Sequence, residues 1–164
     1  MTIHWKTHSL EQEDNDSGYS VWEHPEDQTH GVLALVAAKA AQNQGDLLFG
    51  SFHLAVFRAR HEDHKNIADK KVLAEIADKA GLDVPRLEKD MGRPETWKAV
   101  GQDHTESVEK YDAFGVPTVV FPGNSAVFIK LDALPGDFDE RISLYRFILD
   151  MAVSKPYVHE LKRS

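Results

Sequence analysis

The chain has 164 residues, of which 41% are hydrophobic and 28% are charged, a composition typical of one folded globular domain. Its formal net charge of −8 disfavours binding to nucleic acid or to an anionic membrane surface, because both are negatively charged. It contains no cysteine, so the chain itself supplies no disulfide, thiolate nucleophile or cysteine-ligated metal. No apolar run approaches the ~20 residues of a membrane span, and no secretory signal is recognisable. We therefore expect a cytoplasmic protein.

The N-terminal residues predict a strand followed by an irregular connection. Residues 2–10 have the aromatic and β-branched content of a strand. Residues 11–27 contain seven carboxylates, Glu11, Glu13, Asp14, Asp16, Glu23, Glu26 and Asp27. A solvated loop is favoured over an acid–base or metal site, because no apolar residues bracket these carboxylates to shift a pKa.

Four helices are predicted between residues 31 and 92, where apolar residues recur at three- and four-residue spacing. The predicted spans are 32–41, 47–64, 70–80 and 84–91. Asp69 and Asp83 are placed to cap the third and fourth helices, and Gly81 to end the third.

The second half predicts a long helix, a hairpin and a last helix. Residues 94–113 carry one apolar stripe at helical spacing. Residues 118–121 and 126–129 are two short strands around a turn. Asp137 or Asp139 begins the last helix, whose apolar residues we expect to form a buried face. The whole order predicts an α/β or α+β fold with a helical insertion.

Three features of this order together resemble one family. A Gly115-Val116-Pro117-Thr118 loop follows the long helix and opens a strand. Residues 52–59 (FHLAVFRA) lead to Ile-Ala-Asp at 67–69, and an Ala-Gly-Leu-Asp run ends the helix that follows. With residues 3–10 as a further strand, this order is similar to the DsbA-like thioredoxin-fold oxidoreductases. The tail at 155–163 resembles an actinobacterial branch that includes mycothiol-dependent reductases.

The resemblance implies a single α/β domain over residues 1–164, a thioredoxin-like sheet with an inserted helical subdomain. The insertion would span 28–93, and the thioredoxin-like part would comprise 1–27 and 94–164. The family's first strand and active-site helix, which carry its CxxC motif, have no counterpart in this chain. That strand lies inside the family's sheet, so we expect a rearranged sheet, a homodimer that completes it, or a natural chain that begins upstream.

The resemblance also places a substrate-binding loop at Gly115, Val116, Pro117 and Thr118. Locally an X–Pro bond is cis in only about one case in ten, but the resemblance implies a cis Pro117. The backbone of Val116 would then bind a thiol or a peptide. No catalytic residue can be carried over to this chain.

The function implied is thiol–disulfide oxidoreduction, expected to be inactive in dithiol exchange because cysteine is absent. A non-catalytic thiol- or peptide-binding module is one alternative. A relative of the glutathione-dependent isomerases, whose serine would lie in the missing segment, is another. The candidate cofactor is a low-molecular-weight thiol, mycothiol or glutathione, and the candidate partner is a small thiol or a peptide.

Nine histidines raise a metal hypothesis. His53, His61 and His64 fall on one helical stripe, but they do not form a His-Glu-x-x-His motif. We expect solvated surface groups and no metal site.

Overall fold

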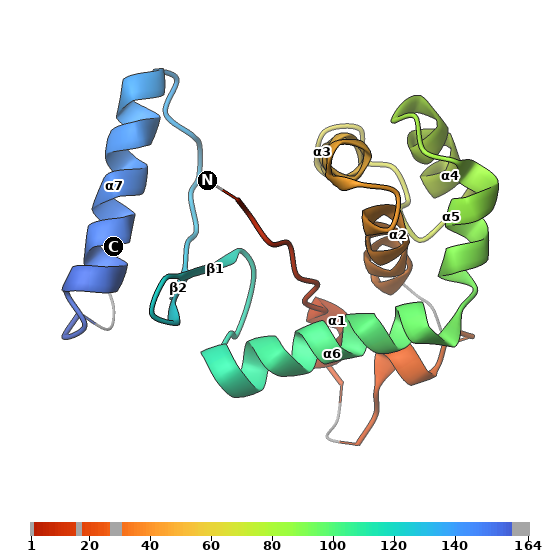
Figure 1. Ribbon diagram of the computed structural model, residues 1–164, viewed down its shortest axis with the longest axis horizontal. Helices are drawn as coiled ribbons and strands as arrows, with labels where there is room; N and C mark the ends of the chain where they lie inside the picture. The colour runs from red at the N-terminus through yellow and green to blue at the C-terminus, as the bar shows by residue number, and fades with distance from the viewer. Residues whose placement is uncertain (1, 16–17, 27–30, 159–164) are drawn as a thin grey trace. The chain divides into compact units, whose positions relative to one another are not determined.

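The computed structural model describes residues 2–15, 18–26 and 31–158, shown in Figure 1. It divides into two compact units, Met1–Thr105 and Glu106–Ser164. The elements are α1 (Leu10–Glu13), the 3-10 helix η1 (Val21–Glu23), α2 (Val32–Gln42), α3 (Asp46–His61), α4 (Lys70–Lys79), α5 (Val84–Met91), α6 (Pro94–Tyr111), β1 (Thr118–Phe121), β2 (Ser125–Phe128) and α7 (Phe138–Ser154). No helix in the described part of the chain is long and apolar enough to cross a membrane.

The four helices predicted between residues 31 and 92 are confirmed as α2 to α5. The side chain of Asp69 accepts a hydrogen bond from the Lys71 N–H at 2.8 Å, and that of Asp83 accepts one from the Arg86 N–H at 3.0 Å. Both caps satisfy N–H groups that the first turn of a helix leaves without partners. The predicted end of α3 is about three residues late, because the chain leaves the helix after His61.

The core of the first unit lies around α2, which packs against α3, α4 and α5. Its buried face is mostly alanine, and small side chains allow neighbouring helices to approach closely. Phe52, Leu73 and Leu87 fill the space around that face and are almost fully buried. Each such side chain contributes about 1.5–3 kcal/mol by leaving water.

The predicted strand at residues 2–10 is wrong. Residues 2–9 form no strand, and α1 begins at Leu10. Instead of a backbone ladder, side chains hold this segment: the Gln42 amide donates to the carbonyl of Trp5 at 3.2 Å, and Asp103 accepts the Thr7 N–H at 2.9 Å. A segment with the composition of a strand forms one only where a second strand is available for pairing. Here the hydrogen-bond partners of the segment are side chains from helices.

The hairpin of the second unit is confirmed. β1 and β2 pair antiparallel, with Thr118 opposite Phe128 and Phe121 opposite Ser125. Gly123 and Asn124 in the turn have positive φ angles of 86° and 63°, which glycine and asparagine tolerate best. Among the described residues the sheet consists of β1 and β2 alone.

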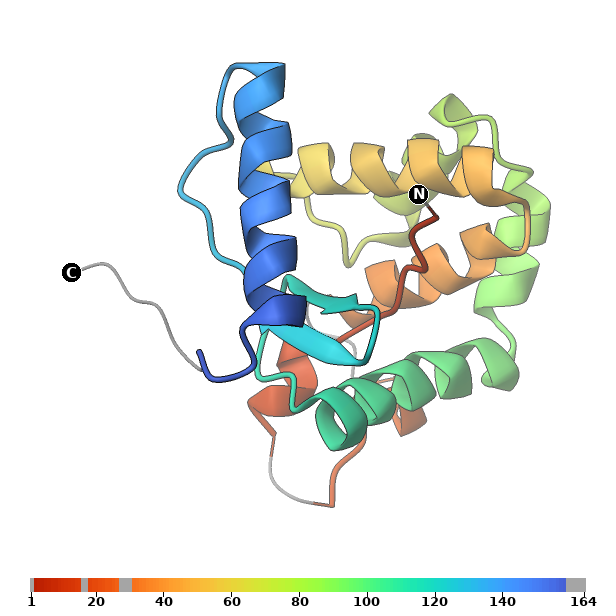
Figure 2. The ribbon, with the colours of Figure 1, turned by 60° about the vertical axis from the view of Figure 1, so that its left-hand side comes forward.

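Helix α7 lies across the hairpin (Figure 2). Asp137 rather than Asp139 is its N-cap, and it accepts from the Glu140 N–H at 3.0 Å. The Ser125 hydroxyl donates to the carbonyl of Ala152 at 2.5 Å and ties β2 to the helix end. The predicted buried face of α7 is wrong: no α7 residue is fully buried, and Phe147 is 57% exposed. A two-stranded hairpin is too small to cover the whole apolar face of a 17-residue helix.

Candidate functional site

The predicted substrate-binding loop, Gly115 to Thr118, connects α6 to β1. Its Val116–Pro117 peptide bond is cis. The Thr118 hydroxyl donates to the carbonyl of Gly115 at 2.7 Å and closes the loop. The ring of Phe128 would lie 3.3 Å from a Cβ added at Gly115, so this ring packs directly on the loop backbone. Val116 is exposed.

The strand that follows the loop has an open edge. The Ile129 N–H donates to the carbonyl of Pro117 at 3.0 Å, which makes residues 117 and 129 a hydrogen-bonded pair. Because such pairs alternate along an antiparallel ladder, the backbone groups of Val119 and Phe121 point to β2. Those of Thr118 and Val120 point away from it, and β1 has no second strand in the described part of the chain.

The loop and the open edge of β1 offer groups that can bind a ligand. The four loop residues carry no ionisable group, and the chain contains no thiol. The edge offers main-chain N–H and C=O groups, beside the apolar side chains of Val116 and Val120. Such a surface suits an extended polypeptide, which brings matching main-chain groups.

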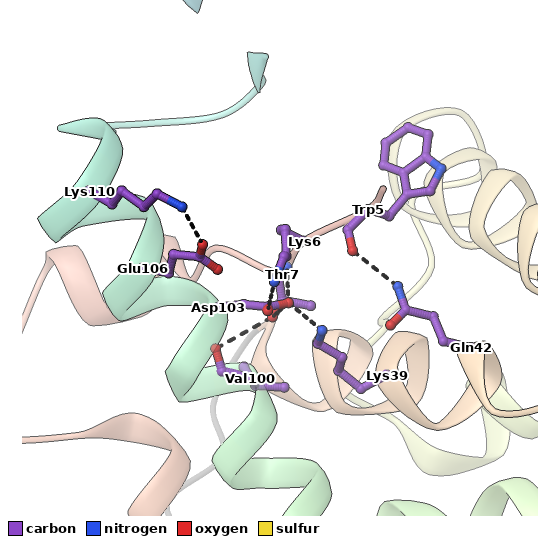
Figure 3. A network of polar contacts seen from close by, with 9 residues as sticks. All are labelled: Trp5, Lys6, Thr7, Lys39, Gln42, Val100, Asp103, Glu106 and Lys110. Carbon is purple, nitrogen blue, oxygen red and sulfur yellow. Dashed lines mark hydrogen bonds and ion pairs between the residues drawn. The ribbon is translucent and has the colours of Figure 1, made fainter. Parts of the chain in front are cut away.

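A second polar assembly fixes residues 5–7 to the helices of the first unit (Figure 3). The carboxylate of Asp103 binds the Lys6 ammonium at 3.0 Å, the Thr7 N–H at 2.9 Å and the ammonium of Lys39. Burial alone would raise the pKa of Asp103, but the hydrogen bonds from Lys39, Thr7 and Lys6 outweigh it and hold that pKa below its usual value. A buried carboxylate with this many donors is a structural anchor.

Beside this anchor lies a cluster of His8, Glu13 and His104. Glu13 Oε1 is 3.3 Å from His8 Nε2 and 3.9 Å from His104 Nε2. The two imidazole rings are tilted against each other with centroids 4.7 Å apart, and the ring of Trp22 covers His104 at 5.3 Å. The Ser9 N–H donates to His104 Nδ1 at 3.2 Å.

Burial shifts the pKa of both histidines in this cluster. It lowers the pKa of His8, and the carboxylate of Glu13 offsets this only in part. It lowers the pKa of His104 as well, with a further decrease from His8. Sequence reasoning missed this cluster, because its members come from residues 2–9, α1 and α6 and share no short spacing.

One carboxylate of residues 11–27, that of Glu11, departs from the prediction of a solvated group, whereas Glu13 is exposed as predicted. Glu11 Oε2 accepts the N–H groups of Gly31 and Val32 at 3.2 and 3.3 Å, at the start of α2. Glu13 belongs to the histidine cluster. Asp16 and Asp27 lie outside the described residues.

The structure does not bring His53, His61 and His64 together as a metal site in the described chain. His61 and His64 are exposed, as expected. The prediction of a solvated group is wrong for His53, whose ring packs against those of Trp5, Phe49 and Phe57 with centroids 4.4–5.2 Å apart. Burial lowers the pKa of His53.

A comparison with protein-family models matches residues 22–138 to the DSBA-like thioredoxin domain. The matched region contains helices α2 to α6, the cis-proline loop and the β1–β2 hairpin. No curated protein matches the chain. Because the family match covers well over half of the chain, this protein belongs to the DSBA-like thioredoxin domain family.

Proposed function

We propose that this chain is a non-catalytic, peptide-binding member of the DsbA-like family. It takes an extended polypeptide along the open edge of β1, beside the cis-proline loop. The observation that carries this proposal is the outward direction of the Thr118 and Val120 backbone groups, which follows from the hydrogen bond between Ile129 and Pro117. A bound strand would satisfy these groups by β-augmentation.

The absence of cysteine supports binding without turnover. Thiol–disulfide exchange proceeds by attack of a thiolate on a disulfide sulfur, and this chain supplies no thiolate. The family's oxidoreductase chemistry therefore requires a thiol from another segment or another molecule.

A peptide fits the site better than a small thiol does. Glutathione carries two carboxylates and an ammonium, and the residues from Gly115 to Thr118 offer no charge to hold them. Main-chain pairing needs no charged side chain.

Finer assignments stay predictions from the sequence resemblance. They are membership of the mycothiol-dependent branch, a cytoplasmic location and a homodimer. A second copy would compete for the same edge of β1, so sedimentation equilibrium must accompany any binding measurement.

The test is a proline substitution that removes an outward N–H. Val120→Pro deletes the edge donor but keeps the ladder to β2, because Val120 does not bond to that strand and proline is tolerated on edge strands. Val120→Thr is the matched control, since it keeps the N–H and the β-branched shape. The probe is a fluorescein-labelled octapeptide of alternating valine and serine, followed by fluorescence anisotropy.

We expect the wild-type chain and Val120→Thr to bind the peptide with affinities within about threefold of each other. Val120→Pro should bind at least tenfold more weakly, the factor that corresponds to about 1.4 kcal/mol for a lost hydrogen bond. Circular dichroism must show that all three proteins are folded. Equal binding by Val120→Pro and Val120→Thr would contradict the proposal.

A further inference from the structure

The cluster of His8, Glu13 and His104 presents a donor set that the peptide-binding proposal does not use. One ligand atom from each residue lies within 4.8 Å of the other two. The imidazoles come from the N-terminal segment and α6, and the carboxylate comes from the last residue of α1. Two imidazoles and one carboxylate are the protein ligands of one common class of catalytic zinc site.

We propose that His8, Glu13 and His104 form a binding site for a divalent first-row transition metal ion, with Zn²⁺ as the best match. Zinc lies about 2.0–2.2 Å from nitrogen and oxygen ligands in a tetrahedral arrangement, so its ligands are about 3.3–3.5 Å from one another. The carboxylate oxygen of Glu13 is already 3.3 Å from His8 Nε2 and 3.9 Å from His104 Nε2. Small side-chain movements complete the three-ligand arrangement.

Burial leaves one side of this site open. The side chains of His8 and His104 are 7% and 9% exposed, whereas that of Glu13 is 37% exposed. A metal ion therefore enters past Glu13, and a fourth ligand from solvent fits on the same side. Away from Glu13, the rings of His8 and His104 pack against each other, and the ring of Trp22 packs against that of His104.

The hydrogen bond from Ser9 to His104 limits the affinity. A metal ion on Nε2 leaves the ring proton on Nδ1, and Nδ1 can then no longer accept the Ser9 N–H. A zinc-binding histidine normally donates a hydrogen bond from the N–H of its second ring nitrogen to an acceptor. Loss of this hydrogen bond weakens metal binding by about 10–100-fold. We therefore expect a site weaker than a structural zinc site by this factor, together with release of the Ser9 amide on binding.

The first experiment is calorimetric titration of the full chain with ZnCl₂, comparing Glu13→Gln with Asp14→Asn. Both variants remove one charge from neighbouring acidic residues, but only Glu13 lies at the cluster. We expect one Zn²⁺ per chain, at least tenfold weaker binding by Glu13→Gln, and unchanged binding by Asp14→Asn. Absence of binding, or equal binding by the two variants, overturns the proposal.

The second experiment needs no variant. Long-range ¹H–¹⁵N spectra of the histidine rings report which nitrogens a metal ion contacts, and amide exchange reports on Ser9. We expect Zn²⁺ to shift the Nε2 signals of His8 and His104 and to speed exchange of the Ser9 amide. Shifts confined to exposed histidines such as His61 and His64 overturn the assignment. This site does not depend on the peptide-binding proposal.

Discussion

At the scale of single residues, His53 shows how burial controls a titration. Its Nε2 atom is buried and has no hydrogen-bond partner among the described residues. Burial lowers the pKa of its ring because the charged form loses its hydration. His53 therefore remains neutral in the folded protein at a pH at which the unfolded chain takes up a proton.

This lowered pKa predicts a pH-dependent stability. The contribution of His53 is fully present above the unfolded value of 6.5 and is lost as the pH falls below that value toward the folded pKa. In His53→Phe, the decrease in the free energy of unfolding between pH 7.5 and pH 5.5 should be smaller than in the wild type. Urea unfolding at both pH values measures the free energy of unfolding of the two proteins. Identical decreases in the wild type and in His53→Phe would show that His53 does not titrate in this way.

A close approach at Gly101 predicts a second residue-scale effect. A Cβ added to Gly101 would lie 2.5 Å from the ring atoms of Trp22, whereas one added to Gly50 would meet nothing within 4 Å. Gly101→Ala should destabilise the fold by about 1–3 kcal/mol through overpacking. Gly50→Ala should stabilise it by about 0.5–1 kcal/mol, because alanine favours the helix. Thermal unfolding that gives both variants the same sign of change would contradict this interpretation.

At the scale of elements, local signals in the sequence were sufficient for helices and turns. Asp69, Asp83 and Asp137 each begin a helix, because a cap depends only on residues two or three positions away. The predicted strand at residues 2–10 failed because a strand requires a partner that composition cannot reveal. The prediction of a buried face on α7 was wrong for a related reason. The area of sheet that is available to cover a helix cannot be read from the residues of that helix.

Of the candidate sites, one could be located from local sequence, whereas the others required the structure. The cis-proline loop could be located, because four consecutive residues after a helix carry the resemblance. The outward direction of Val120 needed the register of the hairpin, which one hydrogen bond from Ile129 sets. The cluster of His8, Glu13 and His104 could not be predicted, because a fold and not a motif brings together residues more than 90 positions apart.

At the scale of the whole molecule, the two units differ in how much apolar surface they bury. The first unit contains the main core, around α2. In the second unit Phe114, Leu134, Phe138 and Phe147 are all more than half exposed. These exposed side chains are available to a partner, which agrees with a unit that receives a partner strand at β1.

Amide hydrogen exchange of β1, followed by NMR with and without the octapeptide, tests peptide binding at this edge most directly. In the free chain the Val119 and Phe121 amides should exchange slowly, because they bond to β2, and the Thr118 and Val120 amides should exchange fast. Saturating peptide should slow Thr118 and Val120 by at least tenfold. If the peptide binds but leaves these two amides unchanged, the polypeptide does not occupy the open edge and the proposed function is contradicted.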